Sequence, residues 1–208
     1  MSIDPKTIPA APAENEPANA FCESSETLAL LARRRSTKAG HFIEPGPSTA
    51  QLDALLQLAA RVPDHGKLAP WRFVVMEGDG RARAGEKIAD VKAHDSVDAS
   101  QIEFARTLFM RAPVVVMVVS SAAPHPKIPE WEQTQSASAA CFALLLSAHA
   151  MGFAGCWLTE WPAYDARARA ALGLEEYERI AGFIYLGTAR EPAIERFRPD
   201  VTTRISRF

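Results

Sequence analysis

The sequence lacks an excess of either charge, a cysteine framework and a long apolar run. Its 208 residues carry 23 Lys and Arg against 25 Asp and Glu, so neither nucleic acid nor a membrane surface is an expected partner. No run reaches the roughly 18 apolar residues of a membrane helix. The three cysteines are widely separated and form no Cys-x-x-Cys pair, which is typical of a reducing compartment. We therefore expect a cytoplasmic protein that binds a small molecule or another copy of itself.

The common catalytic and nucleotide-binding motifs are missing as well. Gly80 and Gly85 have the spacing of a P-loop, but Glu86 replaces the phosphate-binding lysine, and Arg83 replaces the third glycine of a dinucleotide motif. The five histidines lack the spacing of a zinc site, and the Gly-x-Ser-x-Gly segment of a serine hydrolase does not occur. We predict neither a metal site nor a catalytic side chain, so a bound cofactor would have to supply the chemistry.

The N-terminal segment at 1–22, which begins MSIDPKTIPAAPAENEPANAF, differs in composition from the rest of the chain. Proline and acidic residues occur where a secretion signal would need an apolar stretch of roughly 7–15 residues, so we expect no such signal. Its Pro, Ala, Glu and Asn bias cannot bury enough apolar surface to offset the entropy of ordering. We predict a disordered lead at 1–22 and a single folded domain at 23–208, long enough for one sizeable core.

Hydrophobic periodicity and capping residues predict alternating helices and strands. Ser24 or Ser25 can cap a first helix, and Ser48 with Gln51 forms a capping box for a second. The continuous β-branched run at 113–121 is typical of a central strand that is covered on both faces. Helices are predicted at 24–36, 48–62, 80–94, 100–110, 131–151 and 162–172, and strands at 71–76, 113–121, 154–159, 180–187 and near the C-terminus.

The predicted helix at 131–151 contains no proline or glycine and is apolar almost all round, with Gly152 as its stop. Such a helix lies either in the middle of a domain or in a dimer interface. Together with the alternation of elements around a buried sheet, it predicts an α+β or α/β fold of three layers.

Three groups of basic and aromatic residues remain. Arginines and Ser36 end the first predicted helix, where a solvated helix end explains them as well as ligand binding does. Arg61 and His65 flank a proline turn that also fits a surface loop. Trp157 and Thr159 end a predicted strand, where they fit a core and its rim. No group alone decides between a structural role and a functional one.

Taken together, these groups resemble a known set of motifs. The segments RRRS at 33–36, RVPDHGKLAPWRFVV at 61–75, KIPEWEQ at 127–133, GFAGCW at 152–157 and GFIYLGT at 182–188 occur in the order and spacing of the small single-domain bacterial nitroreductases. The resemblance extends from residue 26 to residue 187. The Pro-Asp-His…Pro-Trp turn is its most specific part.

The resemblance implies a fold, an assembly and a reaction. The fold would be an α+β, three-layer α/β/α sandwich with a mostly antiparallel central sheet, in an intertwined homodimer that holds FMN at two interface clefts. Hydride would pass from NADH or NADPH through flavin N5 to a nitroaromatic or a quinone, in a ping-pong sequence. Two alternatives remain open: a flavin-binding or flavin-sequestering protein with little turnover, and a basic interaction module without cofactor.

The resemblance also implies which residues contact the cofactor. The arginine-arginine-serine at Arg34, Arg35 and Ser36 would hold the FMN phosphate or ribityl chain, a role that suits guanidinium groups because they bind phosphate oxygens bidentately. The remaining implied contacts are Arg61 and His65 against the flavin ring, Trp157, Leu158 and Thr159 in a second cofactor segment, and Ala148, His149, Ala150, Met151 and Gly152 beside the nicotinamide.

Overall fold

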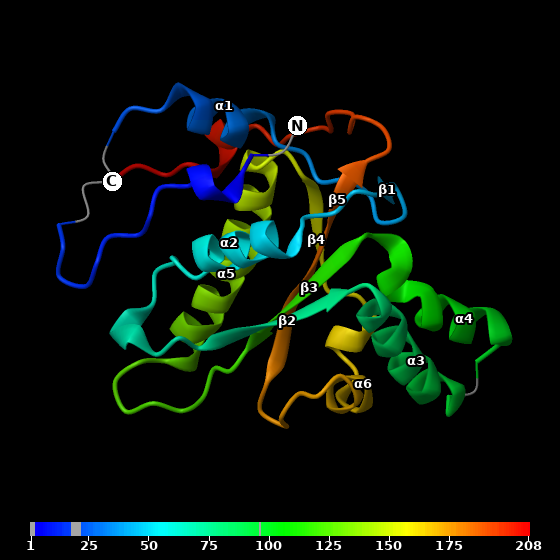
Figure 1. Cartoon of the computed structure of the whole chain (residues 1–208). Helices are drawn as coiled ribbons and strands as arrows, with labels where there is room; N and C mark the ends of the chain where they lie inside the picture. The colour runs from blue at the N-terminus through cyan, green and yellow to red at the C-terminus, as the bar shows by residue number, and fades with distance from the viewer. Residues whose placement is uncertain (1–2, 18–21, 96) are drawn as a thin grey trace.

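The computed structural model describes residues 3–17, 22–95 and 97–208 and has a five-stranded sheet at its centre (Figure 1). The strand order is β1-β5-β3-β2, with β4 also paired to β5, and every pairing is antiparallel. The strands are β1 Phe42–Ile43, β2 Trp71–Glu77, β3 Val114–Ser120, β4 Ala154–Leu158 and β5 Arg179–Ala189.

Helices cover both faces of this sheet. The α-helices are α1 Ser25–Arg33, α2 Thr49–Ala59, α3 Asp79–Ala93, α4 Ala99–Thr107, α5 Glu130–Ala150 and α6 Ala166–Ala171. Short 3-10 helices lie at Pro5–Thr7, His65–Lys67, Leu108–Arg111, Trp161–Ala163 and Val201–Arg204. Within the described ranges, no helix combines the length and the hydropathy needed to cross a membrane.

Strand β3 separates two hydrophobic cores, because alternate residues of a strand point to opposite faces. Its even-numbered residues from Val114 to Val118 pack with α2 and α5, and its odd-numbered residues from Val115 to Val119 pack with α3 and α4. Figure 1 shows α2 and α5 on one side of the sheet and α3, α4 and α6 on the other. The predicted three-layer α+β fold and the doubly covered central strand are confirmed.

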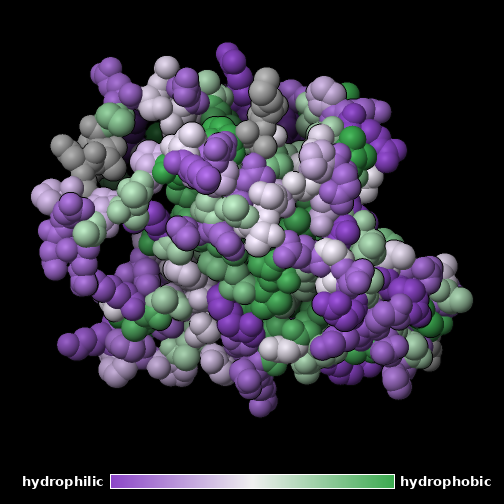
Figure 2. Space-filling view, in the orientation of Figure 1, coloured by the Kyte–Doolittle hydropathy of each residue, from purple (hydrophilic) through white to green (hydrophobic). Residues whose placement is uncertain are grey.

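Polar side chains cover much of the face seen in Figure 2, and apolar side chains reach the surface in its middle, over β2 and β3. Strand β2 is an edge strand of the sheet, and its Val75 is partly open to solvent at 36%. Apolar side chains of α1 are also uncovered in the single chain, since Leu28 is 67% exposed and Leu31 is 46% exposed. Part of the hydrophobic surface of this chain is therefore not used by its own core.

Local capping sets the beginnings and ends of the helices that carry the candidate site. The Ser24 hydroxyl accepts a hydrogen bond from the backbone of Thr27 at the start of α1, and Ser48 with Gln51 forms the predicted capping box of α2. Helix α5 ends at Ala150, and Gly152 two residues later has a φ of +87°. The predicted role of Gly152 as the stop of this helix is confirmed.

Several predicted boundaries were wrong. Helix α1 ends at Arg33, so the next two arginines leave the helix, and α2 ends at Ala59, ahead of the proline turn. The helix predicted at 162–172 is divided into a 3-10 turn and α6, because the Asp165 carboxylate caps the backbone at Arg167 and Ala168. No strand forms at 190–208, where the structure has one 3-10 turn, and the two-residue strand β1 was missed because it is too short for a periodic signal.

Residues 3–12 lie beside α2 in this structure. Ile8 is partly buried against the core beneath α2, the Gln51 side chain donates to the carbonyl of Ile3 at 3.2 Å, and the Ile3 backbone N–H contacts the Met151 carbonyl at 3.4 Å. Residues 1, 2 and 18–21 of the segment predicted to be disordered lie outside the described residues. The division into a disordered lead and a folded domain stays a prediction.

Gly85 offers a test of how closely α3 and α4 pack. A Cβ at Gly85 would overlap the Arg106 carbonyl oxygen of α4, which cannot move without shifting that helix. We expect Gly85→Ala to lower the free energy of unfolding by about 1–3 kcal/mol, even though alanine is the better helix former. Chemical denaturation of both variants would measure this. Gly80→Ala in the same helix is the matched control, since its Cβ would meet nothing closer than 3.7 Å, and equal stabilities would contradict the packing argument.

Candidate functional site

The segment after α1 lies beside the start of β4. Arg34 already has an extended backbone, and the buried Thr37 donates its backbone N–H to the Gly155 carbonyl at 3.1 Å. This bond aligns residues 34–37 with the strand that leads to Trp157. The structure thus brings together two segments that are about 120 residues apart in sequence and that were both predicted to contact a cofactor.

Arg34 has a nitrogen without an acceptor. Its side chain is half-buried, its guanidinium lies 5.9 Å from the centre of the Phe142 ring on α5, and among the described residues its Nη1 has no hydrogen-bond partner although it is buried. A buried charged donor without an acceptor is costly. An anion with several acceptor oxygens, such as a phosphate, would satisfy it.

His149 on the second half of α5 carries another buried nitrogen that has no partner among the described residues. Burial lowers its pKa, and the positive charge of Arg34 lowers it further, so the two side chains are electrostatically coupled. Its Nδ1 is buried and also finds no partner within the described part of the chain. The imidazole therefore stays neutral beside Arg34, and an anion placed here would favour its protonated form.

Arg35 and Ser36 point to a different environment from Arg34. The Nε of Arg35 donates to the Ile194 carbonyl at 3.0 Å, and the guanidinium lies 3.6 Å from the Glu195 carboxylate. Ser36 is exposed and, with Arg35, lines a cavity of about 280 Å³ under residues 191–194. The Arg35 side chain is thus paired with the C-terminal segment, whereas Arg34 Nη1 has no partner in the described part of the chain.

The proline turn at 61–70 is fixed against the other half of α5. The Ser136 hydroxyl donates to the Pro63 carbonyl at 2.7 Å and accepts from the Trp71 indole at 3.2 Å. The Asp64 carboxylate accepts two backbone N–H groups of the turn. The aspartate and the tryptophan of this turn are therefore structural, and they hold the turn that carries Arg61 and His65.

Arg61 and His65 both lie on the surface, beside separate cavities. The His65 Nδ1 is 2.7 Å from the Glu132 carboxylate of α5, and the two line a cavity of about 360 Å³ with Pro63 and Ser136. Arg61 borders a cavity of about 620 Å³ between α2 and residues 5–12. Sequence reasoning missed Glu132, although it belongs to the KIPEWEQ motif, because a carboxylate partner for a turn histidine cannot be assigned without the fold.

The two basic groups lie beside different halves of α5. His65 contacts the first turn of this helix, whereas Arg34 lies by Phe142 and His149 in its second half. At a rise of 1.5 Å per residue, the distance along the helix from Ser136 to His149 is about 20 Å. Figure 1 shows α1 near one end of α5 and the α2–β2 turn near the other. One chain by itself does not bring Arg34 and Arg61 together.

The segment Trp157–Thr159 is held by polar bonds on two sides. The Trp157 indole donates to the Ala181 carbonyl at 3.0 Å and lies so close to Gly182 that a Cβ there would overlap it. The Thr159 hydroxyl accepts from the Tyr164 hydroxyl at 2.9 Å. Leu158 packs against the core on the α3 side. These three residues lie at the end of β4, the strand that Arg34 adjoins at its start.

The end of α5 at residues 148–152 offers few free side chains. Ala148 and Met151 are buried in the core, His149 is half-buried, and only Ala150 and Gly152 are exposed. A nicotinamide contact here would have to use exposed backbone at Ala150 and Gly152. The nicotinamide contact of residues 148–152 stays a prediction.

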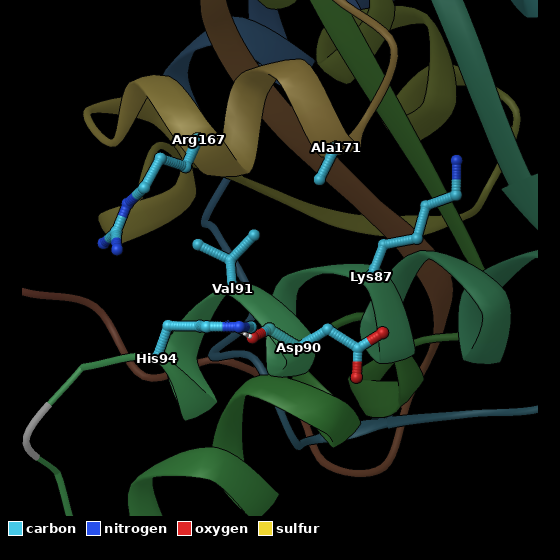
Figure 3. Close-up of a pocket in the computed structure, with 6 residues that line it drawn as sticks. All are labelled: Lys87, Asp90, Val91, His94, Arg167 and Ala171. Atoms are coloured by element: carbon cyan, nitrogen blue, oxygen red, sulfur yellow. Dashed lines mark hydrogen bonds between the residues drawn. The ribbon is translucent and has the colours of Figure 1, made fainter.

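A further hollow, between α3 and α6, does not have the geometry of an anion site. It measures about 420 Å³ and includes Lys87, Val91 and Arg167 (Figure 3). In Figure 3 the charged ends of Lys87 and Arg167 point to opposite sides, and Arg167 is already paired with Asp95 and Asp165. The hollow is an open apolar surface whose cations diverge, so we place the candidate site at α5 and β4.

Comparison with known proteins identifies the family of this chain. The family model described as the Nitroreductase family matches residues 31–188, which include every predicted cofactor residue. The chain belongs to the nitroreductase family.

Relatives of this nitroreductase-family chain match along almost their whole length. YdjA of Escherichia coli (strain K12), provisionally named an NAD(P)H nitroreductase, is 37% identical over 188 residues, which cover 88% of this chain and all of that protein. A nitroreductase-like family protein from Bacillus cereus has a TM-score of 0.78 at 19% identity, with 91% of this chain and 99% of that one covered. A Bacteroides fragilis nitroreductase with bound FMN has a TM-score of 0.66 at 22% identity, with coverage of 89% and 100%.

The lowered pKa of His149 predicts how stability changes with pH. Because its pKa in the folded state is below the unfolded value of 6.5, the unfolded chain binds more protons as the pH falls below about 7, and folding is weakened. One such group contributes a slope of at most about 1.4 kcal/mol per pH unit. We expect His149→Gln to reduce the loss of stability between pH 7 and pH 5, measured by urea unfolding. His94→Gln, an exposed histidine after α3, is the control, and identical pH profiles for wild type and His149→Gln would contradict the coupling.

Proposed function

We propose that this protein is an FMN-dependent oxidoreductase that takes hydride from NADH or NADPH and passes it to an electron-poor acceptor such as a nitroaromatic or a quinone. The observation that carries the proposal is the unpaired, buried guanidinium nitrogen of Arg34, which lies beside the strand that leads to Trp157. Family membership, the NAD(P)H nitroreductase names of the relatives and the FMN in the Bacteroides fragilis structure support it.

The residues present fit the phosphate end of FMN. Arg34 offers a donor that lacks an acceptor among the described residues, and the exposed Ser36 hydroxyl adds a neutral donor nearby. Arg35 would join them once its bond to the Ile194 carbonyl is exchanged for a phosphate oxygen. His149 would lie behind this group and would gain a proton more readily when the charge of Arg34 is neutralised.

The ring end of the cofactor would be bound by the turn. When bound, FMN supplies the hydride chemistry, and the protein contributes charge and hydrogen bonds. Arg61 and His65 are exposed on a turn that two hydrogen bonds hold to α5, so their positions are set before any ligand arrives. The positive charge of Arg61 would stabilise the negative charge that a reduced flavin carries. Trp157, Leu158 and Thr159 would form the adjoining wall, with residues 148–152 beside the nicotinamide.

A homodimer would bring the two ends of the site together. Arg34 lies by Phe142 and His149, whereas the turn that carries Arg61 is attached at Ser136, so the two groups are about 9–20 Å apart along α5. A two-fold axis across α5 would place the first half of one helix beside the second half of its partner. Exposed apolar side chains on α1 and α5, Leu28, Leu31, Trp131 and Phe142, would be covered in such an interface. Each cleft would then take Arg34 from one chain and Arg61 from the other.

Mixed dimers test this sharing of the site. We expect Arg34→Ala and Arg61→Ala homodimers to bind FMN more weakly, by about ten- to a hundredfold for each charge-assisted hydrogen bond that is lost. A heterodimer of the two variants should regain one site of wild-type affinity, because one cleft receives both unaltered residues. FMN titration of co-expressed, differently tagged chains would count the tight sites.

The control for this experiment is a heterodimer of wild type with the Arg34→Ala/Arg61→Ala double variant. In a shared cleft each site then carries one substitution, and no tight site is expected. If both residues served a cleft from the same chain, the two heterodimers would give the reverse result. That reversal would refute the shared site.

Turnover kinetics distinguish the enzyme from a flavin-sequestering protein. One cleft would hold nicotinamide and acceptor in turn, so we expect parallel double-reciprocal lines when NAD(P)H and a nitroaromatic or quinone are both varied. Tight FMN binding with negligible NAD(P)H oxidation would favour the sequestering alternative. A dimer that takes up no FMN would favour an interaction module, and intersecting lines would contradict the single cleft.

A further inference from the structure

The residue that follows the Trp157–Thr159 segment has an unusual backbone conformation. Glu160 has a φ of +53° and a ψ of 179°, a region that is costly for residues other than glycine. It ends β4 and turns the chain into the short helix at Trp161–Ala163. A glutamate remains in this conformation only when its surroundings hold it there.

The Glu160 side chain is held by two groups from other elements. Its Oε2 accepts from the guanidinium of Arg111, which lies before β3, and from the hydroxyl of Tyr185 on β5 at 3.2 Å. The Arg111 Nη2 is also 2.9 Å from that hydroxyl, and its Nε donates to the Leu108 carbonyl at 2.8 Å. We call Arg111, Glu160 and Tyr185 the anchor.

The anchor is buried enough to be rigid. The side chains of Arg111 and Glu160 are 21% and 22% exposed, and Tyr185 is fully buried. The Arg111 guanidinium lies 5.1 Å from the centre of the Tyr185 ring, within cation–π range. Burial raises the pKa of Tyr185, so its hydroxyl stays protonated and can donate to the carboxylate. Each of the three groups thus has a partner that it would lose if either of the others were removed.

We propose that this anchor positions the Trp157–Thr159 segment for the cofactor. Hydrogen bonds join the Trp157 indole to β5 and the Thr159 hydroxyl to Tyr164. Glu160, held by Arg111 and Tyr185, keeps the end of the same segment in its unfavourable backbone conformation. The segment is then ordered before FMN binds, so binding does not bear that entropy cost. Arg111, Glu160 and Tyr185 are positioning residues in this inference, which rests on the proposed function.

Two substitutions at Glu160 separate positioning from simple stability. Glu160→Ala removes the anchor but keeps the unfavourable positive φ, so it should lower both the melting temperature of the cofactor-free protein and its FMN affinity. Glu160→Gly also removes the anchor but tolerates the positive φ, so its melting temperature should exceed that of Glu160→Ala. Its FMN affinity should stay about tenfold below wild type, because the segment is free to leave the bound conformation.

Conservative variants complete the series. Glu160→Gln keeps an acceptor for Arg111 and Tyr185 and should retain FMN affinity within about threefold of wild type. Tyr185→Phe keeps the ring and removes one bond to the carboxylate, so an intermediate loss of about three- to tenfold is expected. Tyr177→Phe removes an exposed hydroxyl outside the anchor and is the matched control. FMN fluorescence quenching gives the affinities and calorimetry the melting temperatures.

The outcomes distinguish this inference from the function on which it rests. If wild type binds FMN and both Glu160→Gly and Tyr185→Phe bind it equally tightly, the anchor does not position the segment. If affinity merely follows melting temperature across the series, its role is structural and the inference fails. Wild type that binds no FMN would overturn the proposed function together with the inference. Weak FMN binding by Glu160→Gly despite its regained stability is the result that supports it.

Discussion

The burial of β3 on both faces is the constraint on which the rest of this structure depends. All seven of its residues are buried, so the strand must lie inside the sheet, and helices must cover both sides of it. Strand β5 runs along it over nearly its full length, from Val114–Leu186 to Ser120–Arg179. The two strands form the platform that carries β4, β1 and β2. The candidate site lies at the edges of this platform, where backbone and side chains again become accessible.

Helix α5 gives the site its dimensions. Its 21 residues extend along one face of the sheet, and both basic groups are attached to it, one at each half. Since the helix is rigid, the separation of Arg34 from Arg61 is fixed in the single chain. Apolar side chains of α1 and α5 are exposed, and among the described residues buried nitrogens of Arg34 and His149 have no partner. Both observations indicate a surface whose contacts the single chain does not satisfy.

Short polar bonds attach the functional segments to the rigid core. Ser136 holds the proline turn, Gly155 holds the segment after α1, and Ala181 holds the Trp157 indole. A comparable bond joins the sheet itself, where Arg72 of β2 binds the buried carboxylate of Glu178 next to β5 through two hydrogen bonds of 2.7 Å. Each bond links segments distant in sequence, which allows loops to keep defined positions although they contribute little hydrophobic burial.

The sequence by itself determined the elements that local chemistry controls. The β-branched run of β3, the capping box of Ser48 and Gln51, and the glycine stop of α5 predicted their elements because periodicity and capping act within a few residues. The motif order also predicted the family. Only the tertiary structure decided that Arg35 is paired with the C-terminal segment while Arg34 is not, that Glu132 faces His65, and that Glu160 is bound by Arg111 and Tyr185. These pairs join residues 25 to about 160 positions apart, and no local pattern encodes which polar groups a three-layer packing will leave in contact.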